Sequence, residues 1–192
     1  MSIKSIRTGW TGISALAGNP VIGDFESIQT VTVGSGGQAN VEFTNIPSSY
    51  QHLQIRYMVR GTRAAADSQF ALRYNGFTSN YTRHRIVGDG STASANGTTA
   101  QAYFDLYDIP GSTATGSTFG VGVIDILDYT NTNKLKTFRA LRGDDRNGSG
   151  SVGLHSTIYT STNSTNAITS FELYCADGNI AQHSHFALYG IR

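Results

Sequence analysis

The sequence predicts an all-β protein: an antiparallel β-sandwich, jelly-roll-like, preceded by an extended or weakly helical N-terminal arm. From Phe25 onward, apolar and polar residues alternate in short runs separated by Gly, Ser, Thr and Asn. Such alternation is typical of strands that bury one side. The runs number about eleven, which suits a sandwich of two antiparallel sheets. Only the first part of the chain shows helical spacing, so we expect an arm over residues 1–24 and a β-domain over 25–192.

Each expected strand is an alternating run between turn residues. In order, the runs are FESIQTVTV, QANVEFT, HLQIRYMVR, SQFALRY, NYTRHRIV, QAYFDLYDI, FGVGVIDILDY, LKTFRALRG, SVGLHSTIY, AITSFELYC and HSHFALYGI. The glycine-rich turn at residues 34–37 predicts that the first two form a hairpin, and Asn147-Gly148 predicts another hairpin tip. The last run continues to Arg192, so we expect the C-terminus to be woven into a sheet.

Two segments between these runs are expected to be loops. Residues 88–99, GDGSTASANGTT, and residues 111–118, GSTATGST, contain no apolar side chain larger than that of alanine. Segments of this composition contribute nothing to a core and are typical of exposed, mobile loops.

The N-terminal arm carries an apolar residue at every third or fourth position, which is the spacing of one helix face. Glycines at positions 9 and 12 oppose a stable isolated helix, because each costs about 1 kcal/mol relative to alanine. The pattern indicates a segment that is ordered by docking, either on another protein or on its own domain. The candidate docking residues are Ile3, Ile6, Trp10, Ile13 and Leu16.

The composition narrows the class of partner. Charged residues make up 14% of 192 residues and the net charge is +1, so no broad field attracts nucleic acid or an anionic membrane. Low net charge also favours self-association. No apolar stretch approaches the length of a membrane span, and the N-terminus makes a poor signal peptide, so we expect a chain made in the cytoplasm. The single cysteine, Cys175, predicts a buried, inert thiol.

Three motifs suggest phosphate or metal binding, but each has a simpler explanation. Glycine runs at 34–37 and 148–150 precede strands rather than helices, so they are turns and not phosphate-binding loops. Residues 144–148, DDRNG, lack the ligand register of a calcium loop. His183 and His185 lie two apart, hence on one side of a strand, but no third metal ligand is indicated. We therefore expect no metal and no cofactor.

The sequence also contains few candidate catalytic residues. Asp105, Asp108, Asp125 and Asp128 could supply the two carboxylates of a glycoside hydrolase, although the sequence does not place them opposite one another. No Gly-x-Ser-x-Gly motif supports a catalytic triad. We expect a protein that is not an enzyme.

Aromatic side chains near loops suggest contact with sugars. Tyrosine and phenylalanine number ten and nine, and some must fill the core. Exposed rings can stack on sugars, while Asn, Ser and Thr supply hydrogen bonds; half-buried rings at strand ends are the alternative. The candidate glycan contacts are Tyr81, His84, Tyr103, Tyr107 and Tyr129.

Several segments together resemble a family of small virion proteins of tailed bacteriophages. The matching stretches, which span most of residues 25–192, are FESIQTVTVGSGG, IPSSYQHLQIR, VIDILDYTNTNKLKTFRAL, NGSG, TNAITS and NIAQHSHFALYGI. The closing FALYGI and DILDYTNTNK are the most specific. The resemblance implies a surface part of the virion, either a capsid decoration protein or an exposed domain of a tail or fibre, and it carries over no catalytic residue.

We therefore expect a structural virion protein, assembled in the host cytoplasm and attached through its arm to the major capsid or tail protein. Capsid decoration is favoured over a tail fibre, because the chain is too short to contain a long shaft. A homotrimer would cover exposed sheet edges. The alternatives are an adhesin that binds host surface glycans and, third, a glycoside hydrolase.

Overall fold

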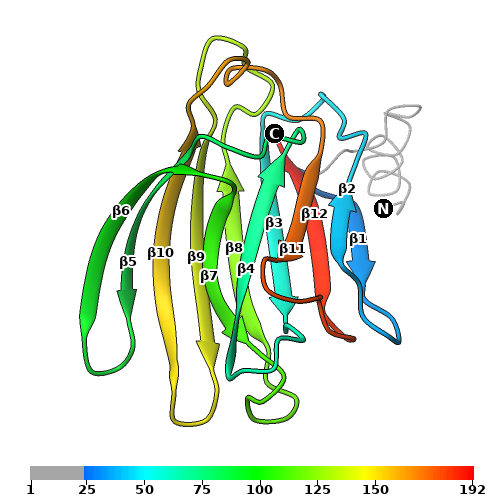
Figure 1. Cartoon of the computed structure of the whole chain (residues 1–192). Helices are drawn as coiled ribbons and strands as arrows, with labels where there is room; N and C mark the ends of the chain where they lie inside the picture. Colours follow the sequence, from blue (N-terminus) through cyan, green and yellow to red (C-terminus); the bar gives the residue numbers. More distant parts are fainter. Residues whose placement is uncertain (1–23) are drawn as a thin grey trace, which may run out of the picture.

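The computed structural model describes residues 24–192, which form two antiparallel sheets packed as a sandwich (Figure 1). The larger sheet has eight strands in the order β1-β12-β3-β8-β9-β10-β5-β6, and the smaller has four in the order β2-β11-β4-β7. The predicted all-β sandwich is confirmed. The strands are β1 Phe25–Thr32, β2 Asn40–Phe43, β3 His52–Val59, β4 Asp67–Tyr74, β5 Tyr81–Gly88, β6 Ala93–Gln101, β7 Phe104–Pro110, β8 Gly120–Ile126, β9 Thr137–Asp145, β10 Gly150–Tyr159, β11 Phe171–Cys175 and β12 His185–Ile191.

Alternation along the strands builds the core between the sheets. In β3 every second residue is buried, namely Leu53, Ile55, Tyr57 and Val59. The residues between them face outward. The smaller sheet supplies aromatic residues such as Phe70, whose ring lies 4.9 Å from that of Tyr57 across the sandwich. Burying large aromatic side chains contributes most of the apolar area that stabilises such a core.

The chain passes repeatedly between the two sheets, which is the jelly-roll-like feature. β1 lies in the larger sheet, β2 in the smaller, β3 in the larger and β4 in the smaller. The C-terminal strand β12 lies between β1 and β3 and pairs with both. The expectation that the C-terminus is woven into a sheet is confirmed.

Two sequence predictions about local pairing were wrong. β1 and β2 do not form a hairpin: β1 pairs with β12, and β2 pairs with β11 in the other sheet. Residues 88–99 are not all loop, because β6 begins at Ala93 and pairs with β5. Most of β6 is exposed and it buries no large side chain, so its order comes from backbone hydrogen bonds that leave no hydrophobic signal in the sequence.

Two other local predictions are confirmed. β9 and β10 form the hairpin whose tip holds Asn147 and Gly148, both at positive φ. Residues 111–118 form a loop of turns without strand. The Arg60 guanidinium donates hydrogen bonds to backbone carbonyls of this loop, at 2.9 Å to both Thr115 and Thr118. A cation that bonds several carbonyls fixes a loop lacking apolar contacts of its own.

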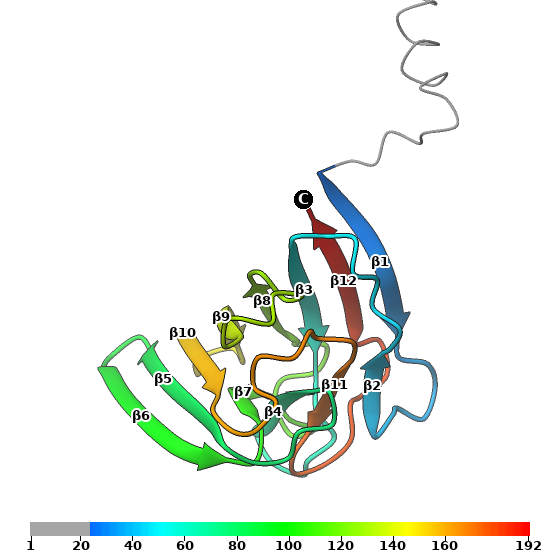
Figure 2. The ribbon, with the colours of Figure 1, turned by 90° about the horizontal axis from the view of Figure 1, so that it is seen from above.

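The two sheets differ in width, and charged residues fill the margin where they part. Figure 2 shows β5 and β6 extending beyond β7, the last strand of the smaller sheet. Arg83 of β5 points inward and pairs with Asp105 of β7, and both side chains are buried. This ion pair therefore joins the two sheets at the edge of the core.

A second buried group continues from this pair along β9 and β10. The Arg142 guanidinium donates to the Ser151 hydroxyl at 2.8 Å and to Asp144 at 3.2 Å. Its Nε donates to Nε2 of His155, so the imidazole is neutral and carries its proton on Nδ1. The ring of Tyr107 packs among the guanidinium groups, with that of Arg142 at 5.5 Å.

Removing one partner of the Arg83–Asp105 pair should strongly destabilise the fold. Asp105→Asn leaves the Arg83 charge buried without a counter-charge, which costs about 3–5 kcal/mol. Urea unfolding would measure the loss. As a control, Asp125→Asn breaks an outward pair with Arg139, whose side chain is 69% exposed, and should cost less than about 1 kcal/mol. Equal losses in the two variants would contradict the role assigned to the buried pair.

Stability should fall between pH 7 and pH 5 because of His155. Burial, and then the charges of Arg142, Arg83 and Arg85, lower the pKa of His155 from 6.5 to about 3. The unfolded chain therefore binds a proton in this range while the folded chain does not, which costs about 2 kcal/mol. We expect His155→Gln to remove about that much of the pH dependence, measured by urea unfolding at both pH values. An unchanged slope would show that other groups dominate.

Candidate binding surface

The outward sides of the two sheets differ in character. All of the large apolar side chains that are exposed among residues 24–192 lie on the outward side of the larger sheet or at the ends of its strands. They are Phe25, Met58, Ile86, Val121, Leu127, Leu135, Leu141, Val152 and Leu154. We call the outward side of this sheet the open face. Since monomeric proteins rarely expose large continuous apolar patches, the open face is the candidate binding surface.

The strand register joins the apolar residues into a continuous stripe. Val123 of β8 lies opposite Leu141 of β9, Leu141 opposite Leu154 of β10, and Leu154 opposite Ile86 of β5. Side chains at directly paired positions are about 5 Å apart, close enough for contact. A parallel row beside the stripe contains Met58, which lies opposite Val121.

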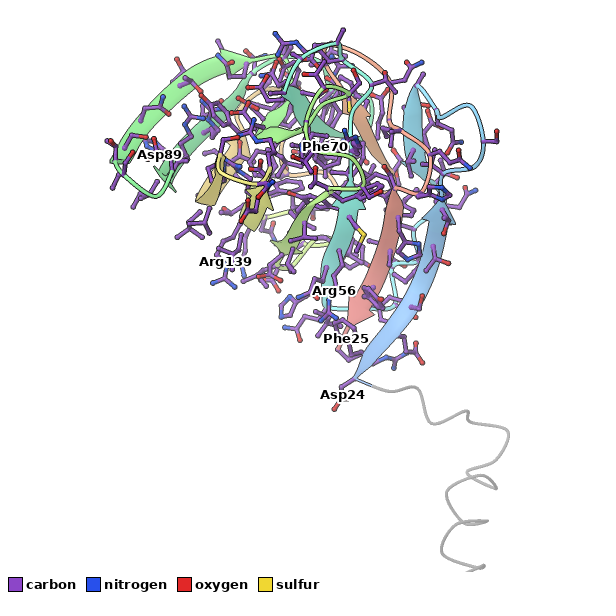
Figure 3. The ribbon with its side chains drawn as sticks, turned by 90° about the horizontal axis from the view of Figure 1, so that it is seen from below. Asp24, Phe25, Arg56, Phe70, Asp89 and Arg139 are labelled. Carbon is purple, nitrogen blue, oxygen red and sulfur yellow. The ribbon has the colours of Figure 1, made fainter. Side chains whose placement is uncertain are left out.

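The arginines on the open face already make contacts within the chain. Arg139 lies 2.7 Å from Asp125, which also accepts a hydrogen bond from Gln54 at 2.8 Å. Arg56 lies over the stacked rings of Phe25 and Tyr189, at 5.1 and 5.4 Å from their centres. Figure 3 shows Arg56, Phe25 and Arg139 projecting from the same side of the sheet, away from Phe70 in the core.

A groove of about 800 Å³ hollows one part of the open face. Its lining combines apolar side chains with hydrogen-bonding groups from β5, β6, β8, β9, β10 and the loop between β8 and β9. The lining residues that matter here are His84, Ile86, Asn96, Asp125, Leu127, Lys134, Leu135, Arg139 and Leu154. Burial raises the pKa of Asp125, but hydrogen bonds from Arg139 and Gln54 outweigh it and hold the pKa below its ordinary value.

A buried lysine holds the loop that forms one wall of the groove. Lys136 is fully buried, and its ammonium group donates to the carbonyls of Asn131, Lys134 and Thr165. The last two distances are both 3.0 Å. Burial lowers the pKa of this lysine. The ammonium therefore ties the β8–β9 loop to the segment between β10 and β11.

The structure does not bring the predicted glycan contacts together. Tyr81 and Tyr129 are fully buried, so the expectation that their rings border exposed surface was wrong. Tyr107 lies half-buried among arginines between the sheets, and Tyr103 packs against Tyr174 of the smaller sheet. Of the five candidates, His84 alone lines the groove.

The structure brings together two of the four candidate hydrolase carboxylates, because Asp125 and Asp128 both line the groove. Asp125 pairs with Arg139 and Asp128 with Lys134. Asp105 instead faces the core, so it does not share the groove with these two carboxylates. Burial raises the pKa of Asp108, which lies in β7 and not in the groove. His183 lies in a turn at positive φ before β12, whereas His185 contacts Thr32 at 2.8 Å. Across residues 24–192 no three His, Cys, Asp or Glu side chains cluster as metal ligands would.

Two further predictions concern the arm and the thiol. The docking residues Ile3, Ile6, Trp10, Ile13 and Leu16 lie outside the described residues, so their role stays a prediction. Cys175 is buried as expected, and burial raises the pKa of its thiol to about 12. Over the described part of the chain no helix is long and apolar enough to cross a membrane.

Sequence reasoning missed the open face because alternation does not say which side of a strand is inward. In β10 the apolar residues Val152 and Leu154 point outward, while Gly153 and His155 point into the sandwich. The available signal was a contradiction within β9, where Leu141 has the opposite parity to Phe138 and Ala140. A strand with apolar residues on both sides indicates a second surface that needs a partner.

Comparison with known proteins adds no relative: no family model, curated protein or solved structure matches this chain.

Replacing the buried lysine should loosen the groove wall. Lys136→Met keeps the length of the side chain but removes its hydrogen bonds to three carbonyls, so we expect at least tenfold faster amide hydrogen exchange at residues 128–136 and 163–168. Lys134→Met is the matched control, since that side chain is 60% exposed and its contact with Asp128 is a surface ion pair that contributes little energy. Equal exchange in the wild type and the Lys136 variant would show that the lysine does not hold the loop.

Proposed function

We propose that this protein is a structural virion component of a tailed bacteriophage, displayed on the particle surface and attached through its N-terminal arm, with capsid decoration as its role. The observation that carries the proposal is the open face, an apolar surface on a rigid scaffold that has no cover within the described chain. A surface of this kind suits assembly by burial of area more than it suits chemistry on a small substrate. The resemblance of residues 25–192 to small virion proteins supports the same role.

The position of β1 supports attachment at one end of the sandwich. Phe25 begins β1 and pairs with Ile191, so the N-terminal segment enters beside the C-terminal end of β12. The hairpins β5–β6 and β9–β10 turn at the opposite end (Figure 1). A chain held by its N-terminal arm would therefore present these two hairpins away from the particle.

Co-sedimentation tests the attachment. Full-length protein and a deletion of residues 1–23 are each mixed with undecorated capsids and with tails, and the bound fraction is measured after pelleting. We expect the full-length protein to pellet with capsids and the deletion to lose at least nine-tenths of that binding, because the apolar residues of the arm make the contact. Retained binding by the deletion would place the contact on the β-domain, and binding to neither particle would contradict a virion role.

A second candidate, an adhesin for host surface glycans, is favoured by one observation. The groove places hydrogen-bonding groups of His84, Asn96 and Arg139 beside apolar side chains. Polar groups of this kind beside apolar surface can fix the orientation of a sugar. A glycan array would measure binding, and Arg139→Ala should weaken it at least tenfold while Arg63→Ala, outside the groove, leaves it unchanged. Absence of binding on the array would end this candidate.

A further inference from the structure

The open face is too apolar to suit a protein that remains a monomer in water. Its central stripe of Val123, Leu141, Leu154 and Ile86 crosses four adjacent strands, and Leu141 is 58% exposed. The outward side of the smaller sheet is polar instead: Asn40 bonds Glu172 at 3.2 Å, and Arg73 pairs with the same carboxylate. This asymmetry marks one side of the sandwich for contact.

We propose that a second copy of this chain covers the open face, so that the larger sheets of two protomers pack face to face. Eight strands spaced about 4.8 Å apart, each with about seven residues, give a face of about 34 by 24 Å. That is about 800 Å², the area that each partner buries in a standard stable interface. The pairing uses the same surface that supports the proposed virion role, and it leaves attachment to the particle to the N-terminal arm.

The charges of the open face suit contact with an identical surface. None of the eight strands of the larger sheet contains lysine, one of the residues depleted from interfaces. Lys134, in the loop beside the groove, pairs with Asp128 at 2.5 Å. Arg139 is neutralised by Asp125, and Arg56 is stacked on Phe25 and Tyr189. The pairing of Arg139 removes one source of repulsion between two such faces, and a net charge of +1 adds little more.

The stripe is also self-complementary. Its four positions are apolar from end to end, so a two-fold axis through its middle lays the stripe of one copy along that of the other. The axis brings Leu141 against Leu154 of the second copy, and Val123 against Ile86. The same patch serves both protomers, as the isologous interface of a two-fold dimer requires.

Sedimentation velocity of the full-length protein over a range of micromolar concentrations tests the pairing. We expect the mass of two chains for the wild type, whereas the mass of three chains would favour the homotrimer expected from the sequence. We also expect a Kd at least tenfold weaker for Leu141→Glu and for Leu154→Glu, since each places a charge at the centre of the contact. Ala102→Glu is the matched control, because Ala102 is exposed in the turn before β7 and away from the stripe. A wild type that stays monomeric, or variants that associate as tightly as the wild type, would overturn the proposal.

Cross-linking tests the same contact through the formation of a disulfide, and does not rely on a loss of association. A Leu141→Cys protein is mixed with a Leu154→Cys protein under mild oxidation, and the natural Cys175 is buried and gives no background. We expect a disulfide-linked pair of chains that forms at least tenfold faster than with Leu141→Cys and Ala102→Cys. Equal rates would contradict face-to-face packing.

Deletion of residues 1–23 tests whether the N-terminal segment of the same chain, and not a second copy, covers the open face. If a second copy covers the open face, the deleted protein associates as the full-length protein does. If the N-terminal segment of the same chain covers it, the full-length protein is a monomer and the deletion associates. In that case Leu154→Glu would also shift the fluorescence of Trp10, the sole tryptophan, toward that of a solvated ring. This pair of results would overturn the proposal in favour of the segment.

Discussion

Two sheets of unequal width must share one core, and much of this structure follows from that constraint. The four-stranded sheet covers only part of the eight-stranded sheet, so the inner face changes character from β3 toward β5. Where the sheets overlap, aromatic and aliphatic side chains fill the space. Where they part, Arg83 and Asp105 meet, and a polar group around Arg142 replaces apolar packing.

The buried charges at this margin constrain how the sheets can be aligned. An ion pair withdrawn from water gains little net stability, but leaving one of its members unpaired is costly. The pair between β5 and β7 therefore penalises any arrangement in which the two strands slide past each other. His155 adds to this group as a neutral acceptor for Arg142, which ties the integrity of the margin to pH.

Arg142 of β9 and His155 of β10 point into the sandwich, so apolar residues at neighbouring positions of the same strands face outward. In β10 the inward positions are occupied by Gly153 and His155, so Val152 and Leu154 are presented to solvent. The exposed stripe of the open face and the charged margin are thus two consequences of one arrangement. The binding surface therefore arises from the way the strands are oriented.

The sequence by itself determined the all-β class, eleven of the twelve strands as alternating runs within a few residues of their ends, the β9–β10 hairpin and the buried thiol of Cys175. These features depend on local periodicity and turn chemistry. The sequence missed β6, whose exposed polar residues carry no periodic signal, and it paired β1 with β2, since it cannot identify partners distant in the chain. Only the tertiary structure decided which side of each strand faces inward. That choice buried Tyr81, exposed Leu141 and Leu154, and created the open face. The reason is that parity along a strand specifies two sides, and packing against the second sheet selects one.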